Sequence, residues 1–207
     1  MSLLLSSAMA SAASADVETR DGESSAVPLN YGILLFRAYT PVDIFAPVDI
    51  LQMHARAYPL NLAFIARTMD PVTTEPASAA MNPLNSSVWY TVPPTHTVDN
   101  PPPLDVLIVP GGPGTRSPDL GPEIDFVRRT QPGLKYLLTI CTGAGIAAQA
   151  GVLDGRRATT NKNAWATITA QGPKVRWVSP ARWVEDGNIW SSSGVSHCSH
   201  LTMSGGG

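Results

Sequence analysis

Short apolar runs alternate with helical patterns along most of this chain. The run YGILLF at 31–36 has the length of a buried strand, and LNLAFIART at 60–68 and LDVLIVPGG at 104–112 predict two further strands. LKYLLTI at 134–140 predicts another. Runs that are apolar at nearly every position are typical of parallel strands covered on both faces.

The segments between these runs carry helical spacing. Residues 40–58 (TPVDIFAPVDILQMHARAY) predict a helix, with Pro47 expected in an early turn. Its regularly spaced apolar positions are Ile44, Val48, Leu51 and Ala55. Residues 121–131 and 142–151 predict two more helices, and 156–172 predicts a short strand followed by a helix.

The remaining segments indicate loops and one hairpin. Residues 70–103 are rich in Pro, Ser, Thr and Asn and predict irregular chain with a strand at 87–92 (SVWYTV). Residues 174–194 predict a hairpin, because the Asp-Gly of EDGN at 185–188 is a turn signal between alternating apolar positions. The whole pattern predicts a three-layer α/β/α sandwich with a mostly parallel sheet and a late β-hairpin.

Composition narrows the class of protein. A chain of 207 residues is long enough for one substantial domain. A net charge of −2 argues against a broad nucleic-acid or anionic-membrane surface. No apolar run approaches the roughly 20 residues of a membrane helix. We therefore expect a soluble protein that meets a small-molecule substrate, with no nucleic acid and no membrane as partner.

The two ends of the chain differ from the middle. Residues 1–28 are rich in Ala and Ser and predict a disordered leader, which leaves 29–196 as the domain and 197–207 as an irregular tail. A secretory signal stays open, although the leader lacks a basic n-region and its apolar stretch is short. We expect a cytoplasmic location.

Neither a metal nor an organic cofactor is expected. The chain has two cysteines, Cys141 and Cys198, which is too few for a disulfide framework. The cluster HCSH at 197–200 could bind a metal, but a chance polar end is the favoured interpretation. GGPGTR at 111–116 is Gly-rich but lacks the further residues of a phosphate or dinucleotide loop.

Cys141 stands between a predicted strand and a predicted helix. In an open parallel sheet, sites collect outside the carboxyl ends of the strands. A helix that opens with Thr142 leaves unpaired N–H groups near the thiol, which predicts a lowered pKa and a reactive thiolate. The Thr142 amide with an amide of Gly111 or Gly112 could stabilise an oxyanion. The residues alone leave open whether Cys141 is a nucleophile or an inert buried thiol.

Three motifs together carry a family resemblance. IVPGG (108–112), ICTGAGIAAQAGVLDGRRATTN (140–161) and SSSGVS (191–196) resemble the PfpI/ThiJ superfamily of class I glutamine amidotransferase-like proteins, in the style of its isocyanide (isonitrile) hydratase-like branch. The resemblance runs from about residue 31 to residue 196. It implies a flavodoxin-like fold with a nucleophile elbow, usually dimeric, and a reactive cysteine at Cys141.

The same resemblance implies an acidic partner for the cysteine. Members carry a Glu or Asp just after the first strand, hydrogen-bonded to the sulfur, and Asp43 matches it. Like-charge repulsion and partial burial would raise the pKa of this carboxyl. Protonated, it could donate to the sulfur or give a proton to a developing carbanion. Asp43 also suits the N-cap of the following helix, and both roles can hold at once.

Two departures from the family pattern matter. Many members place a His after the TT of ATTNKNAW (158–165), where this chain has Asn161. An amide takes no proton at neutral pH, so a Cys-His hydrolysis lacks its base, whereas a hydratase does not need it. The family also continues into a long helix after SSSGVS, and the tail 197–207 shows no helical pattern in its place.

The leading hypothesis is a cysteine-dependent hydratase or lyase that converts an isocyanide and water into an N-substituted formamide. Cys141 would be the nucleophile and Asp43 the acid and base, with Gly111, Gly112 and Thr142 shaping the anion site. We expect a homodimer without cofactors. Two alternatives stay open: a redox or stress sensor that acts through oxidation of Cys141, and an inactive family member whose C-terminus is truncated.

Overall fold

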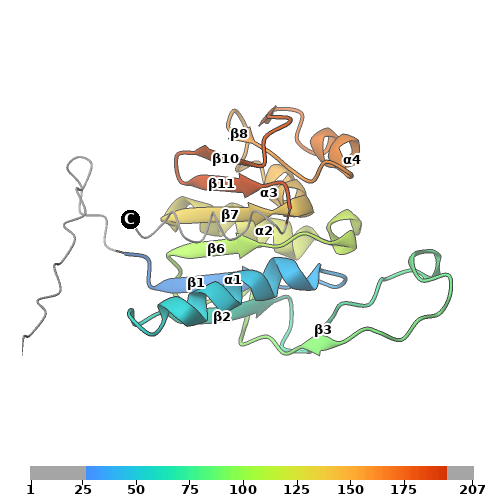
Figure 1. Ribbon diagram of the computed structural model, residues 1–207, viewed down its shortest axis with the longest axis horizontal. Helices are drawn as coiled ribbons and strands as arrows, with labels where there is room; N and C mark the ends of the chain where they lie inside the picture. Colours follow the sequence, from blue (N-terminus) through green and yellow to red (C-terminus); the bar gives the residue numbers. More distant parts are fainter. Residues whose placement is uncertain (1–26, 195–207) are drawn as a thin grey trace, which may run out of the picture.

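The computed structural model describes residues 27–194, and Figure 1 shows a central sheet with helices packed against it. The predicted leader 1–28 lies outside these residues except for its last two positions. The predicted tail 197–207 lies wholly outside them. The expectations for these two segments therefore stay predictions.

Within residues 27–194, a seven-stranded sheet has the order β10-β11-β7-β6-β1-β2-β5. Its strands are β1 Asn30–Leu34, β2 Asn61–Ala66, β5 His96–Thr97, β6 Val106–Val109, β7 Tyr136–Ile140, β10 Trp183–Asp186 and β11 Ile189–Ser192. Neighbouring strands pair in parallel except β10 with β11, which is antiparallel. The predicted mostly parallel sheet with a late hairpin is confirmed.

Two small sheets lie beside the main one. β3 (Val72–Thr73) pairs with β4 (Thr91–Val92), and β8 (Arg157–Ala158) pairs with β9 (Arg176–Trp177). The strand predicted at 87–92 is thus wrong except for its last two residues. Val88 is 79% exposed, so the first part of that run does not pack against a sheet, whereas Val92 is buried in β4. β3 and β5 arise in a segment whose sequence predicted only loops.

Four α-helices and several 3-10 turns connect the strands of the described chain. The helices are α1 Pro41–His54, α2 Gly121–Thr130, α3 Ala144–Gln149 and α4 Trp165–Ala170. The turns are η1 Ala79–Met81, η2 Pro113–Arg116, η3 Gln131–Gly133 and η4 Cys141–Gly143. Pro41 opens α1, where its fixed φ favours a helix start. Pro47 lies inside α1 rather than in an early turn, which corrects the prediction.

The helical connections between parallel strands place helices on both faces of the sheet. The crossover from β1 through α1 to β2 runs toward one edge of the sheet, and that from β6 through α2 to β7 runs toward the other. Since such crossovers are right-handed, their helices lie on opposite faces. Figure 1 shows α1 in front of the sheet. The predicted three-layer sandwich is confirmed, and the strand order reverses between β1 and β6, where sites of such folds gather.

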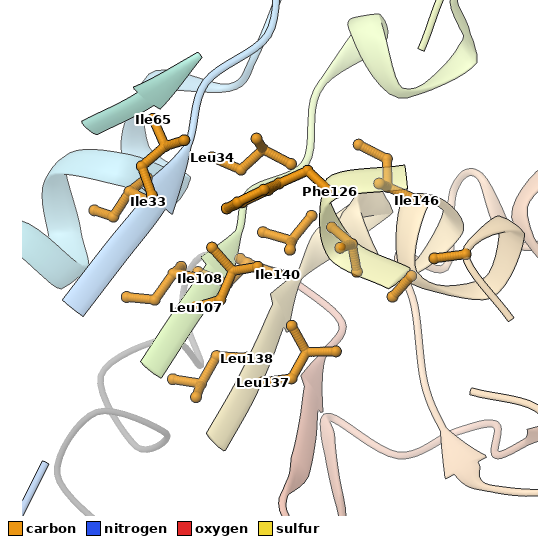
Figure 2. Packing of buried hydrophobic residues seen from close by; sticks show 14 of the residues in the cluster. Ile33, Leu34, Ile65, Leu107, Ile108, Phe126, Leu137, Leu138, Ile140 and Ile146 are labelled. Carbon is orange, nitrogen blue, oxygen red and sulfur yellow. The ribbon is translucent and has the colours of Figure 1, made fainter. Parts of the chain in front are cut away.

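The core fills both faces of the sheet. Figure 2 shows Ile33 beside Ile65 on one face of β1, and Leu34 beside Phe126 on the other. All four residues of β6 are buried, as expected for a central parallel strand. Each fully buried side chain of this kind contributes about 1.5–3 kcal/mol to the free energy of unfolding. This packing fixes the strand ends that carry the candidate site.

Candidate active site

Cys141 forms the corner between β7 and the helical turn η4, which leads into α3. Its φ is +56°, in the left-handed region that side chains other than glycine rarely adopt. The Thr160 hydroxyl donates to the Cys141 carbonyl at 2.8 Å and helps to hold this conformation. A residue held in a sparsely populated conformation by its surroundings is a candidate for function. The predicted strand-to-helix corner is confirmed.

Small residues let the chain after the corner approach the sheet. A Cβ at Gly143 would lie 2.3 Å from the Val109 carbonyl oxygen and 2.6 Å from that of Pro110. No side chain fits in that space, so the turn η4 packs against the end of β6 only because residue 143 is glycine. The run of Gly and Ala after Cys141 thus has a steric reason.

Asp43 is the buried carboxyl of the site. It has no exposed surface, and its Oδ2 accepts a hydrogen bond of 2.9 Å from the Gly111 N–H. Within residues 27–194, its Oδ1 has no hydrogen-bond partner. The N-cap of α1 is Thr40 and makes no side-chain cap hydrogen bond, so the alternative of Asp43 as N-cap is wrong. The carboxyl is instead turned toward the cysteine corner.

Gly111 lies where the parts of the site meet. A Cβ on this glycine would lie 2.7 Å from the Cys141 Cβ, 2.7 Å from the Thr142 nitrogen and 2.8 Å from the Asp43 Oδ2. The thiol residue, the carboxyl and the first amide of the helical turn therefore surround one point. The structure brings together Cys141, Asp43, Gly111 and Thr142, as the sequence predicted.

Gly112 and Thr142 bind each other. The Gly112 N–H donates to the Thr142 Oγ1 at 2.9 Å, and the Thr142 hydroxyl lies 3.2 Å from the Gly112 carbonyl oxygen as a donor. Because the Gly111 N–H donates to Asp43, both glycine amides already have partners inside the protein. Their role as donors to a reaction anion stays a prediction. Hydrogen bonding from the Thr142 backbone instead lowers the pKa of the Cys141 thiol.

Asn161 is the contact that sequence reasoning missed. Hydrogen bonding from its side chain is among the causes that lower the pKa of Cys141. Its Oδ1 accepts the Ala164 N–H at 3.1 Å, and its Nδ2 donates to the Ser193 carbonyl at 3.4 Å. These two bonds hold the Asn161 amide in place. The sequence did hold an indication of this contact. Asn161 stands where many family members have a His paired with the cysteine.

The pKa values of the thiol and the carboxyl are both raised. Burial raises the pKa of Cys141, as does the charge of Asp43, while hydrogen bonds from Thr142 and Asn161 oppose the rise. The predicted lowering of the thiol pKa is therefore wrong. Burial raises the pKa of Asp43 to about 6, against the hydrogen bond from Gly111. At pH 7 the site thus holds a thiol next to a mostly ionised carboxylate.

Residues 27–194 contain neither a candidate metal site nor a candidate membrane-spanning helix. Among residues 27–194, no group of three or more His, Cys, Asp or Glu is arranged to hold a metal ion. The cluster HCSH at 197–200 lies outside these residues. In the region that the structure covers, no helix has the length and apolar character needed to cross a membrane. The cytoplasmic location stays a prediction.

The structure is a mostly parallel α/β sandwich with a cysteine of positive φ beside a buried carboxyl at a strand-to-helix corner. The model of the DJ-1/PfpI family matches residues 32–204. The chain therefore belongs to the DJ-1/PfpI family, in agreement with the resemblance of its motifs.

Several known proteins are similar to this chain. The isonitrile hydratase of Pseudomonas putida is 31% identical over 170 residues, which cover 81% of this chain and 66% of that protein. The chain thus spans just under two thirds of that relative's length. A ThiJ/PfpI family protein from Pseudomonas syringae has a TM-score of 0.67 at 23% identity. The match covers 92% of this chain and 75% of the Pseudomonas syringae chain. An AraC family transcriptional regulator from Pseudomonas putida has a TM-score of 0.68 at 21% identity. The match covers 86% of this chain and 90% of the regulator's chain. These two structures show the fold.

Proposed function

We propose that this protein is a cysteine-dependent hydratase that adds water to a small isocyanide and releases an N-substituted formamide. The observation that carries the proposal is the buried Asp43 carboxyl, which lies beside Cys141 with one oxygen unpaired within residues 27–194. A carboxylate in this position can move protons to and from both sulfur and substrate. The similarity to an isonitrile hydratase supports the choice of substrate.

In the first step, Asp43 takes the thiol proton while the Cys141 sulfur attacks the terminal carbon of the isocyanide. A C–S bond forms, and the negative charge moves onto that carbon. Asp43 then returns its proton to the carbon, which gives a thioimidate bound to the enzyme. A raised pKa suits Asp43 to both transfers, because general acid–base catalysis works best with a pKa near the working pH.

In the second step, water adds to the thioimidate carbon. One of its protons goes to the nitrogen, and the other goes to the sulfur through Asp43 as the C–S bond breaks. The products are the formamide and the free thiol. One isocyanide and one water are consumed for each formamide, and no oxidant or reductant takes part.

The surrounding donors stabilise the sulfur as it loses its proton. The Thr142 N–H and the Asn161 side chain both hydrogen-bond it, and hydrogen bonds to a charged acceptor are stronger than neutral ones. Gly111 and Gly112 shape the anion site by holding Asp43 and Thr142 in place. Asn161 cannot act as a base, which argues against amide hydrolysis by a Cys-His pair.

The sensor alternative has less support. Selective oxidation favours cysteines that are largely thiolate at neutral pH. Burial and the charge of Asp43 raise the pKa of Cys141, so the thiolate is the minor form there. The same site suits a nucleophile whose proton is removed only when the substrate is bound.

We further propose that the protein is a homodimer that pairs through the outer face of α1. This helix is apolar on both sides: Ile44 faces the core, whereas Val42 and Phe45 are 42% and 41% exposed. Phe45 also contacts the Tyr90 ring, at 6.2 Å between centroids. Val42 and Phe45 are three positions apart and therefore lie on one face of the helix, and the family resemblance implies a dimer. A Phe45→Glu variant is expected to elute as a monomer in light-scattering chromatography; an unchanged mass would contradict this interface.

The enzymatic proposal is tested by incubating the full chain with cyclohexyl isocyanide and measuring N-cyclohexylformamide by gas chromatography. We expect formamide in proportion to enzyme and time, and no ammonia from glutamine in a parallel reaction. If no formamide forms, while mild peroxide converts Cys141 to a stable sulfinate, the sensor alternative replaces the proposal.

A further inference from the structure

A cavity of about 910 Å³ opens beside the candidate active site, at the carboxyl ends of β1 and β2. Residues 35–38 and Ala66 form its floor, and residues 70–81, called the arm here, form one wall. Residues 113–123 form the opposite wall. Figure 1 shows the chain around β3 projecting away from the sheet. Neither Cys141 nor Asp43 lines this cavity, so it is separate from the proposed reaction site.

The lining of the cavity is mainly apolar. Leu35 and Phe36 contribute from the end of β1, Val72 and Met81 from the arm, and Leu120 from the start of α2. The volume lies in the range of sites that hold small organic ligands, which are typically apolar with a few polar groups. The body of a matching ligand is therefore apolar.

Three arginines line the cavity, and two of them are already paired. Arg37 donates to the Glu75 carboxylate at 3.1 Å. Arg67 pairs with the buried Glu123 at 2.9 Å and with Asp119 at 2.8 Å. These pairs hold the walls together and leave little charge for a ligand.

Arg116 is different. It lies on η2 and lines the cavity, and its exposed side chain makes no hydrogen bond or ion pair with any residue of 27–194. The acidic residues that line the same cavity do not pair with the Arg116 charge. Asp119 is bound to Arg67, and Asp70 accepts the Thr68 hydroxyl at 2.9 Å. A guanidinium without an internal partner is suited to bind a carboxylate or another planar anion.

The wall toward the active site is one backbone layer thick. The Gly114 N–H donates to the Ala38 carbonyl at 3.0 Å, and both residues line the cavity. Two residues further along, the Thr40 N–H donates to the carbonyl of Gly111, whose own N–H holds Asp43. A Cβ at Gly114 would lie 1.9 Å from the Arg37 carbonyl oxygen, so only glycine allows the two backbone segments to approach this closely. The two sites are therefore adjacent and share backbone hydrogen bonds, while Cys141 and Asp43 do not line the cavity.

We propose that this cavity is a second ligand site, which binds an organic acid with an apolar body and pairs its carboxylate with Arg116. The apolar floor buries the body of the ligand, and the unpaired guanidinium fixes its charged end. The proposal does not rest on the isocyanide reaction, because Cys141 takes no part in the site.

The test compares three probes with the same ten-carbon chain: decanoate, decanol and decyltrimethylammonium. Binding to the full chain is measured by isothermal titration below the micellar range of each probe. Arg116→Gln removes the charge, and Arg176→Gln is the matched control, since Arg176 is an exposed arginine on β9. Ala77→Trp fills the cavity from the arm, and circular dichroism checks that each variant is folded. Cys141→Ser separates this site from the reaction.

We expect decanoate to bind the wild type, the Arg176→Gln control and the Cys141→Ser variant with equal affinity. Arg116→Gln is expected to weaken decanoate about ten-fold, which corresponds to the loss of one charge-assisted hydrogen bond, and Ala77→Trp to abolish binding. Equal binding of decanol and decanoate, tighter binding of the ammonium probe, or no effect of Arg116→Gln would overturn the acid site. Absence of binding by all three probes would overturn the proposal as a whole.

Discussion

The Asp43 carboxylate accepts the Gly111 N–H at 2.9 Å, and this bond orients the acid toward the cysteine corner. One carboxyl oxygen is thereby fixed, while the other has no partner within residues 27–194 and no exposed surface. A carboxyl with one bound and one unpaired oxygen can exchange a proton without losing its position. The proposed proton transfers depend on this arrangement.

Gly111→Ala is expected to damage both the fold and the site, because the new Cβ would lie 2.7 Å from the Cys141 Cβ and 2.8 Å from the Asp43 Oδ2. Overpacking of this kind costs about 1–3 kcal/mol in the free energy of unfolding. Urea denaturation measures it, with Gly121→Ala as the control, since no atom lies within 4 Å of a Cβ there. Equal losses in both variants would contradict the tight approach at Gly111.

Asp43 is expected to make stability depend on pH. Burial raises its pKa from 3.8 to about 6, so between these values the folded state binds a proton that the unfolded state has lost. Its contribution to stability is present below pH 4 and is lost as pH rises through 6, by about 3 kcal/mol. The stability of Asp43→Asn relative to wild type should therefore rise by about 2 kcal/mol from pH 4 to pH 7 in urea titrations, since part of the change occurs below pH 4. A difference that is constant with pH would contradict the raised pKa.

The same group predicts the pH dependence of turnover. Asp43 must be ionised to take the thiol proton, so kcat/KM should fall as pH drops through about 6. Rates measured with cyclohexyl isocyanide from pH 4.5 to pH 8 test this. Asp43→Asn should show low activity at every pH. A wild-type rate that increases on acidification would mean that the protonated acid starts the reaction.

Asn161→Ala is expected to raise the pKa of Cys141 further, because it removes a donor to the sulfur. A hydrogen bond to a charged group contributes about 1.5–3 kcal/mol, so the thiolate fraction should fall about ten-fold or more. The rate of alkylation by iodoacetamide reports this fraction. Asn163→Ala is the matched control, an exposed asparagine two positions away. If the two variants react at the same rate, Asn161 does not support the thiolate.

Much of the fold could be predicted from periodicity. The parallel strands are apolar at nearly every position because both faces are covered, and Asp-Gly marks the turn between β10 and β11. The chain between β2 and β6 could not be predicted, because β3, β4 and β5 have two residues each. Such short strands carry no periodic signal, and their positions depend on pairing with distant residues.

The sequence predicted which residues lie together at the cysteine corner but not their electrostatics, and their roles stay a proposal. The motifs and the family resemblance identified Cys141 and Asp43, and the structure places them around Gly111. The predicted lowering of the Cys141 pKa was wrong. The pKa is raised by burial and by the nearby Asp43 carboxylate, and neither can be deduced from the local sequence. The contact of Asn161 with the sulfur depends for the same reason on how distant loops pack.

We propose Cys141 as the nucleophile of an isocyanide hydratase. The most direct measurement is the initial rate of N-cyclohexylformamide formation by wild type, Cys141→Ser and Cys198→Ser under identical conditions. We predict that Cys141→Ser falls to the uncatalysed rate, whereas the control Cys198→Ser, which changes the other cysteine, keeps the wild-type rate. Formamide production by a folded Cys141→Ser protein at the wild-type rate would contradict the account.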